Sequence, residues 1–175
     1  QSLTRDAVAG VDDGLEAVVA IHDAVRGALE YTSGATYVGM DLAEVVDAGK
    51  GVCQDYAHLA LALYRTAGIP ARYVSGYLYS EDQSSGVAPD SAEIGVQTHA
   101  WVEVLMPGWG WWGIDPTNAT PVSSRHTKIG HGRDYDDVMP LRGTYHGEPE
   151  HVLDVAVRIS RETLSAFQQA QAQQQ

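Results

Sequence analysis

Apolar residues in the first third of the chain recur at helical spacing. Over residues 11–30 they return at intervals of three and four, which predicts an amphipathic helix. A second, shorter helix is predicted over residues 41–48, with Asp41 as its N-cap and Gly49 just past its end. The segment between them has no such period and contains two glycines, so we expect a loop there.

A third helix is predicted from Cys53 to Ala67. The glycine-rich segment 49–51 leads into it, and Gly68 followed by Pro70 ends it. Alanine, leucine and tyrosine fall at helical spacing within it, so one face should be buried. The cysteine therefore stands in the first turn of this helix.

After this helix the period changes to two, which predicts strands. Residues 71–79 form the first expected strand, and residues 81–95 form a polar loop rich in serine, glycine and proline. Residues 98–106 and 111–115 are two further expected strands, and the turn at 107–110 would join them as a hairpin.

The last third of the chain is less regular. Residues 118–147 are rich in glycine, histidine and aspartate, whereas residues 152–159 alternate and predict a last strand with one buried face. From residue 168 only glutamine and alanine occur, so we expect a disordered tail. Residues 1–167 are thus expected to form one catalytic domain, with residues 168–175 as the tail.

The composition of the chain argues against two classes of binding partner, nucleic acids and membranes. A net charge of −12 without a basic run argues against a nucleic-acid partner. No apolar stretch is long enough to span a bilayer, and residues 1–5 do not resemble a signal peptide, so no membrane partner is expected. A single cysteine cannot form an internal disulfide, which fits a reducing compartment and predicts a cytoplasmic location.

Three residues with catalytic side chains occur in the order Cys53, His99, Asp115. Cys53 stands at a predicted helix start, where the helix dipole and free N–H groups favour the thiolate. His99 lies on one strand of the predicted hairpin and Asp115 ends the other, and paired strands lie about 5 Å apart. Thiol, imidazole and carboxylate are the groups of a nucleophile, its base and the group that orients the base.

Each of the three also has a structural interpretation. A lone cysteine is often a small apolar residue of the core. A histidine on an alternating strand can be a packed or a surface residue, although the alternation here turns His99 and Trp101 away from the apolar face. An aspartate before Pro116 can form an Asx turn, which is compatible with a catalytic role.

Four segments around these residues have a distinctive order and spacing. They are Gly49-x-Gly51-x-Cys53-x-x-Tyr56-Ala57, then Ala67-Gly68-Ile69-Pro70-Ala71-Arg72-Tyr73-Val74-Ser75-Gly76-Tyr77, then His99-Ala100-Trp101-Val102-Glu103-Val104, and finally Gly110-Trp111-Trp112-Gly113-Ile114-Asp115-Pro116-Thr117. Together they resemble the transglutaminase-like superfamily, in particular its microbial branch of papain-like cysteine peptidases. The similarity extends over residues 21–115, and residues 132–145 also resemble that branch.

The resemblance implies a fold and three roles. The fold is an α+β, papain-like core in which the nucleophile helix packs on an antiparallel β-sheet. Cys53 would be the nucleophile, His99 the general base and acid, and Asp115 the group that holds the imidazole. Microbial relatives often carry an additional β-rich domain upstream, so we expect that such a domain is missing from this chain.

Substrate contacts are expected close to the nucleophile. The backbone N–H of Cys53 is the simplest donor to an oxyanion. Animal relatives add a tryptophan upstream of the cysteine, and this chain has none there, so Tyr37 or Gln54 is expected to replace it. Trp101, beside His99, is the best candidate for a substrate contact in the cleft.

The expected reaction is attack on an amide or peptide bond through a thioester, most simply hydrolysis of a peptide or protein substrate. Transamidation of protein glutamine is one alternative, and a catalytically retired binding or scaffold domain is another. No cofactor is expected: an acidic calcium loop is absent from the sequence. No metal is expected either, because the late histidines, His126 among them, lack the spacing of metal ligands.

Overall fold

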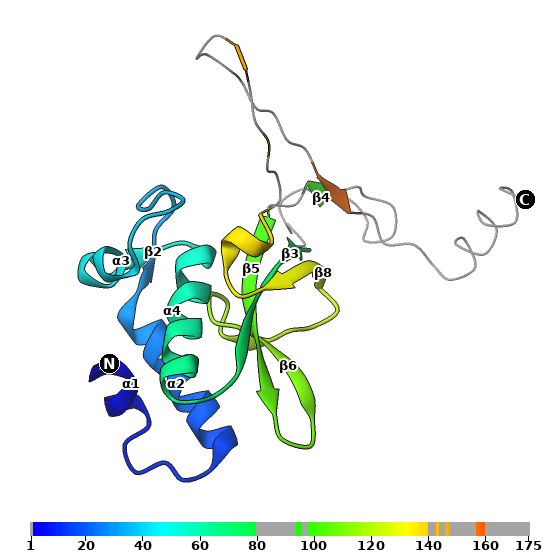
Figure 1. The fold of residues 1–175 in the computed structure, drawn as a ribbon. Helices are drawn as coiled ribbons and strands as arrows, with labels where there is room; N and C mark the ends of the chain where they lie inside the picture. Colours follow the sequence, from blue (N-terminus) through cyan, green and yellow to red (C-terminus); the bar gives the residue numbers. More distant parts are fainter. Residues whose placement is uncertain are drawn as a thin grey trace, which may run out of the picture.

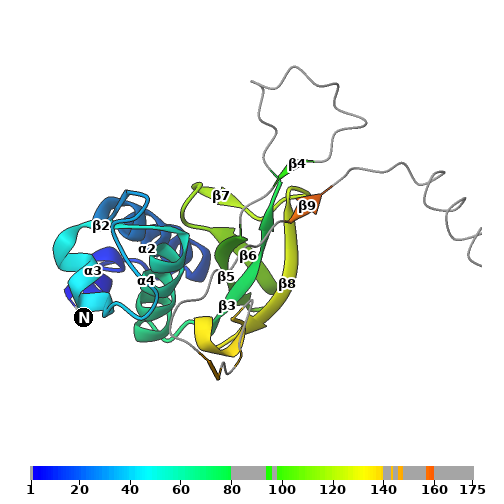
Figure 2. The ribbon, with the colours of Figure 1, turned by 90° about the horizontal axis from the view of Figure 1, so that it is seen from above.

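The computed structural model describes residues 2–79, 94–95, 98–139, 143, 146–147 and 157–159. Helices gather on one side of an antiparallel five-stranded sheet, as Figures 1 and 2 show from two directions. Helix α4 (Cys53–Thr66) contacts both the sheet and the other helices, so it stands at the centre of the core. This arrangement confirms the predicted α+β class, with the nucleophile helix packed on an antiparallel sheet.

Helix α2 (Gly14–Ala28) is the long amphipathic helix that the sequence predicts. Its N-cap is Asp13, whose carboxylate accepts hydrogen bonds from two backbone N–H groups of the first turn. The short helix α1 (Ser2–Ala7) precedes it and was not predicted, because six residues are too few to display a period. The face of α2 toward the core buries Val18, Ile21 and Val25.

Helix α3 (Leu42–Ala48) confirms both of its predicted boundaries. The carboxylate of Asp41 accepts a hydrogen bond from the first turn, and Gly49 has a φ of 64°, the left-handed conformation that suits glycine after a helix. Helix α4 begins at Cys53 as predicted and ends one residue before the predicted boundary. None of the helices among the described residues is long and apolar enough to cross a membrane.

The main sheet has the strand order β7-β6-β5-β3-β8, with every neighbouring pair antiparallel. Its strands are β3 (Ala71–Leu78), β5 (Thr98–Met106), β6 (Gly110–Asp115), β7 (Thr120–Pro121) and β8 (His126–Gly132). Two residues of β1 (Glu30–Tyr31) pair in parallel with β2 (Lys50–Gly51), and a 3₁₀ helix, η2, spans Tyr135–Asp137.

The two faces of the sheet differ in content. Apolar residues of β5 at alternate positions join the core beneath α4; they are Ala100, Val102 and Val104. The other face carries His99 and Trp101 of β5 and Asp115 of β6, as the alternation predicts.

The strand predictions for β3, β5 and β6 are confirmed, whereas β8 was not predicted. Most of the predicted loop at 81–95 lies outside the described residues, except β4 (Ile94–Gly95), which pairs with β9 (Arg158–Ile159). Only the end of the predicted strand at 152–159 is described, and the predicted tail lies outside the described residues.

Candidate active site

Cys53 is the first residue of α4, and the carboxylate of Asp55 organises the turn around it. Asp55 accepts a hydrogen bond of 2.8 Å from the backbone N–H of Val52 and one of 2.6 Å from Oγ1 of Thr36. The bond from Val52 is one of the two hydrogen bonds of a capping box. The other is missing, because the valine side chain has no polar atom to accept it. The bond from Thr36 ties the loop at 32–41 to the helix start. Cys53 itself is half-buried, so its thiol remains accessible.

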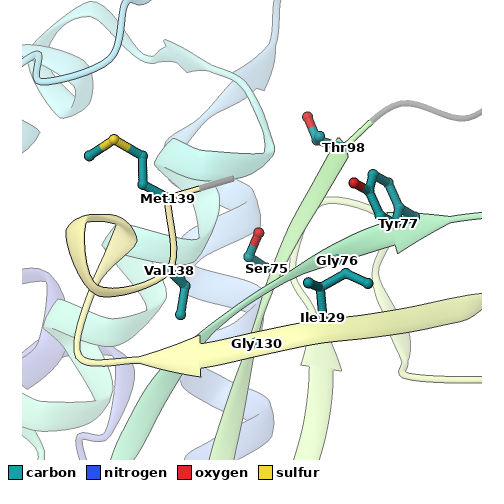
Figure 3. A pocket seen from close by; sticks show the side chains of 8 residues that line it. All are labelled: Ser75, Gly76, Tyr77, Thr98, Ile129, Gly130, Val138 and Met139. Atoms are coloured by element: carbon teal, nitrogen blue, oxygen red, sulfur yellow. The ribbon is translucent and has the colours of Figure 1, made fainter. Parts of the chain in front are cut away.

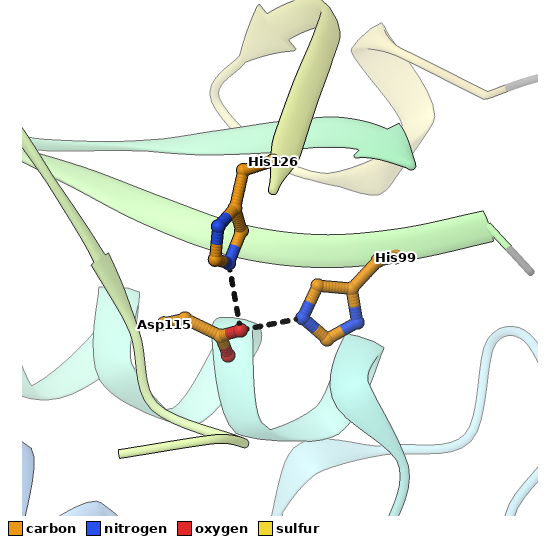
Figure 4. Close-up of side chains that lie close together, drawn as sticks. All are labelled: His99, Asp115 and His126. Atoms are coloured by element: carbon orange, nitrogen blue, oxygen red, sulfur yellow. Dashed lines mark hydrogen bonds and ion pairs between the residues drawn. The ribbon is translucent and has the colours of Figure 1, made fainter. Parts of the chain in front are cut away.

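The imidazole of His99 is held by Asp115 through one nitrogen, which leaves the other for Cys53. Nε2 of His99 lies 2.7 Å from Oδ2 of Asp115 (Figure 4). Burial alone would lower the pKa of His99, but hydrogen bonds to Asp115 and to Cys53 raise this pKa to about 9. The imidazolium is therefore the stable form near neutral pH. The structure brings the three predicted residues together.

Asp115 is fully buried and held from both oxygens. Its Oδ1 accepts hydrogen bonds from the backbone N–H groups of Thr117, at 3.0 Å, and of Asn118, at 3.2 Å. Its Oδ2 accepts hydrogen bonds from the side chains of His99, His126 and Asn118 at 2.7, 3.1 and 2.7 Å. Burial alone would raise the pKa of Asp115, but these side-chain donors, His99 foremost, hold it well below its usual range. The carboxylate that forms the Asx turn thus also binds His99.

His126 is the residue of this site that the sequence did not reveal. It begins β8, its side chain is 3% exposed, and its Nε2 lies 3.1 Å from Oδ2 of Asp115. Figure 4 shows both imidazole rings directed at the same carboxylate. Two strands separate β8 from β6 in the sheet, so no strand pairing brings the two residues together. No local signal of the sequence could have found this contact.

Trp101 lies beside His99 as expected, but its side chain is buried. Its side chain is 1% exposed, with ring centroids 5.2 Å from His126 and 6.1 Å from His99. Its indole nitrogen is buried without a hydrogen-bond partner among the described residues. A side chain so buried offers no surface to a substrate. We therefore assign Trp101 to the packing against the two imidazole rings rather than to substrate contact.

The other predicted substrate contacts lie near the start of α4. Tyr37 is exposed in the loop that Thr36 ties to Asp55, and Gln54 is the half-buried second residue of the helix. Backbone N–H groups in the first turn of a helix have no intrahelical carbonyl to bind. Those of Cys53 and Gln54 are thus candidate donors to an oxyanion, and the roles of the Tyr37 and Gln54 side chains stay predictions.

The cluster of His99, Asp115 and His126 also has the composition of a metal site. Their ligating atoms lie within 4.8 Å of one another. Hydrogen bonds already account for this spacing, because one carboxylate oxygen lies 2.7 and 3.1 Å from the two ring nitrogens. We interpret the cluster as a hydrogen-bond network.

A cavity of about 240 Å³ opens on the sheet beside Thr98, the residue before His99. Figure 3 shows its lining, in which the hydroxyl groups of Ser75 and Thr98 lie on the same side of the sheet. Apolar side chains complete it, namely Ile129 of β8 and Met139, which follows η2.

Comparison with known proteins gives one family. A sequence model of the transglutaminase-like superfamily matches residues 1–116. An uncharacterised protein of Mycobacterium leprae is 41% identical over 147 residues, which cover 83% of this chain and 50% of that protein. A protein-glutamine gamma-glutamyltransferase of Pseudomonas aeruginosa is 39% identical over 71 residues, which cover 41% of this chain and 10% of that protein. The chain spans about half, or less, of the length of the curated relatives it matches.

A solved structure supports the same relationship. The crystal structure of a candidate cysteine protease from Cytophaga hutchinsonii has a TM-score of 0.65 and 30% identity to this chain. The similarity covers 79% of this chain and 43% of that one. Cys53, His99 and Asp115 lie within the residues that the superfamily model matches, whereas His126 lies beyond them.

Proposed function

Because the chain belongs to the transglutaminase-like superfamily, we propose that it catalyses thiol-dependent acyl chemistry at an amide or peptide bond, with hydrolysis as the main outcome. One observation carries this proposal: Asp115 holds the His99 ring at 2.7 Å through Nε2, and the same ring also interacts with the side chain of Cys53. The pKa of His99, about 9, keeps the ring protonated beside the thiol. A thiolate beside an imidazolium is the resting state of a cysteine nucleophile.

The chemistry follows from this arrangement. The Cys53 thiolate attacks the carbonyl carbon, a carbon–sulfur bond forms, and the oxygen takes the negative charge. Backbone N–H groups at the start of α4 stabilise that oxyanion. His99 then gives its Nδ1 proton to the leaving amine, the carbon–nitrogen bond breaks, and a thioester remains. Next, His99 takes a proton from water, and the resulting hydroxide releases the acid and regenerates the thiolate.

Hydrolysis is placed ahead of amine transfer because no feature of the described residues identifies a binding site for an amine. The cavity beside Thr98 is small and largely apolar, without an acidic side chain to bind an ammonium group. Transamidation is the second candidate. It is favoured by the similarity to the Pseudomonas aeruginosa glutamyltransferase, although that similarity covers only 10% of that protein.

A catalytically retired domain is the third candidate. Such a domain would have no need of a buried carboxylate with five donors or of an imidazole aligned with a thiol. The chain has all three residues. A hydrogen bond of 2.7 Å connects His99 with Asp115, and His99 also interacts with the thiol of Cys53. These features favour an enzyme whose substrate is a peptide or protein amide.

The test compares two products from an N-blocked glutaminyl-glycine dipeptide, with a chelator present. The free γ-carboxylic acid of the dipeptide reports hydrolysis, and its labelled hydroxamate reports transfer to hydroxylamine. Ammonia is released in both reactions, because it leaves when the thioester forms. We expect the free acid to exceed the hydroxamate and Cys53→Ala to abolish both. Dominant incorporation would reverse the order of the two reactions. Absence of a thioester with this dipeptide and with 4-nitrophenyl acetate would favour the retired domain.

A further inference from the structure

We propose that His126 is a positioning residue for the reaction: it anchors Asp115, and through it His99, as a second imidazole on the same carboxylate. This inference rests on the proposed function. His126 Nε2 lies 3.1 Å from Oδ2 of Asp115, on the oxygen that also binds His99 at 2.7 Å. His126 does not touch the reacting atoms, so it acts only through the carboxylate.

The hydrogen bonds of His126 assign its tautomer. Its Nδ1 accepts from the backbone N–H of Ser123 at 3.2 Å, with Oγ of the same serine at 3.4 Å. A backbone N–H can only donate, so Nδ1 must be the unprotonated nitrogen. The ring proton is therefore on Nε2, where it points at Asp115. His126 is thus a fixed donor to the carboxylate and does not compete as a proton acceptor.

Close packing holds the ring in place. The edge of Trp101 meets the His126 ring at an interplanar angle of 79°, with centroids 5.2 Å apart. Trp101 can lie there only because Gly76 has no side chain: a Cβ would come within 2.5 Å of the indole and would also strike the carbonyl of Thr127. The pairing of β3 with β8 shifts register between Ser75 and Gly76, next to this contact.

Three donors on one oxygen have a functional consequence. During the reaction, His99 gives up its proton and its attraction to Asp115 weakens. His126 and the side chain of Asn118, at 2.7 Å, still hold Oδ2 at that moment. The carboxylate therefore keeps its orientation while the imidazole is neutral. This predicts that loss of the His126 donor lowers kcat and leaves KM unchanged.

The experiment separates the hydrogen bond from the ring. In His126→Gln, the side-chain amide can donate from nearly the position of Nε2, whereas His126→Asn is one methylene too short and His126→Phe keeps a ring without a donor. The control is His131→Phe at an exposed position of the same strand. The readouts are kcat and KM for hydrolysis of 4-nitrophenyl acetate, together with the rate of iodoacetamide alkylation of Cys53 at pH 6.

We expect the Asn and Phe variants to lose roughly 10- to 100-fold in kcat, the range of one hydrogen bond to a charged group, with KM within about twofold. The Gln variant should stay within about threefold of the parent, since it restores the donor. If the Phe variant does not fold, the kcat of the Gln variant compared with that of the Asn variant decides whether the donor matters. Parental kcat in the Asn variant, or an equal loss in Gln and Asn, would overturn the role of His126. A parent protein with neither ester hydrolysis nor alkylation at pH 6 would instead refute the proposed function.

Discussion

The Oδ2 atom of Asp115 lies 2.7 Å from Nε2 of His99, and this contact decides which ring nitrogen faces Cys53. The carboxylate itself cannot turn, because two backbone N–H groups hold its other oxygen at 3.0 and 3.2 Å. The orientation of the base is therefore determined by the turn after β6 as much as by the strand that carries His99.

Replacing Asp115 with asparagine should impair catalysis without abolishing the fold. The amide would present an N–H to His99 and would favour the wrong tautomer of the imidazole. We expect kcat for 4-nitrophenyl acetate to fall about 1000-fold, with a smaller change in KM. Circular dichroism should show the native helical signal, and a kcat within tenfold of the parent would contradict the orienting role.

Cys53 should react with iodoacetamide in the native protein at pH 6 faster than N-acetylcysteine does. The raised pKa of His99 keeps its ring protonated at this pH, and a positive charge beside a cysteine side chain makes it more reactive. We expect an excess of about tenfold or more, which His99→Gln should remove. Mass spectrometry of the labelled protein measures the rate. Equal rates for the parent and His99→Gln would show that the two residues do not form an ion pair.

Stability should fall at alkaline pH because of His99. Its pKa is about 9 in the folded protein and 6.5 in the reference state, so the folded state binds the proton more tightly. This contribution is complete below about pH 6.5 and is lost as the pH rises through about 9. It amounts to roughly 3 kcal/mol of unfolding free energy.

Urea unfolding of the parent and of His99→Gln at pH 6 and pH 9.5 measures this contribution. The difference between the two proteins should shrink by roughly 3 kcal/mol from the lower to the higher pH. His131→Gln, at an exposed position on β8, should show no such change. A difference independent of pH would refute the raised pKa.

Gly76→Ala should destabilise the fold and disturb the site together. The added Cβ would come within 2.5 Å of Trp101, which packs against both His99 and His126. We expect a loss of about 1–3 kcal/mol in unfolding free energy, typical of overpacking, and a lower kcat. The control is Gly130→Ala, whose Cβ would lie 3.4 Å from Val138 and should change little. Equal stability of the two variants would argue against the close packing around Trp101.

Local patterns in the sequence determined the helices and the central strands. The boundaries of α3 follow from a cap and a glycine, and those of β5 from strict alternation, because these signals act within a few residues. Cys53, His99 and Asp115 could be predicted for the same reason, since each stands at the start or end of an element or beside it.

Only the tertiary structure decided the surroundings of Asp115. Two strands, β5 and β3, lie between β6 and β8, yet His126 at the start of β8 lies 3.1 Å from the carboxylate and packs against Trp101. Trp101 is also buried, although the alternation of β5 alone puts it on the face away from the core. Strand periodicity specifies which face of a sheet a side chain takes. Which side chains of distant strands then meet depends on how the strands twist and pack together, and no local pattern in the sequence records that.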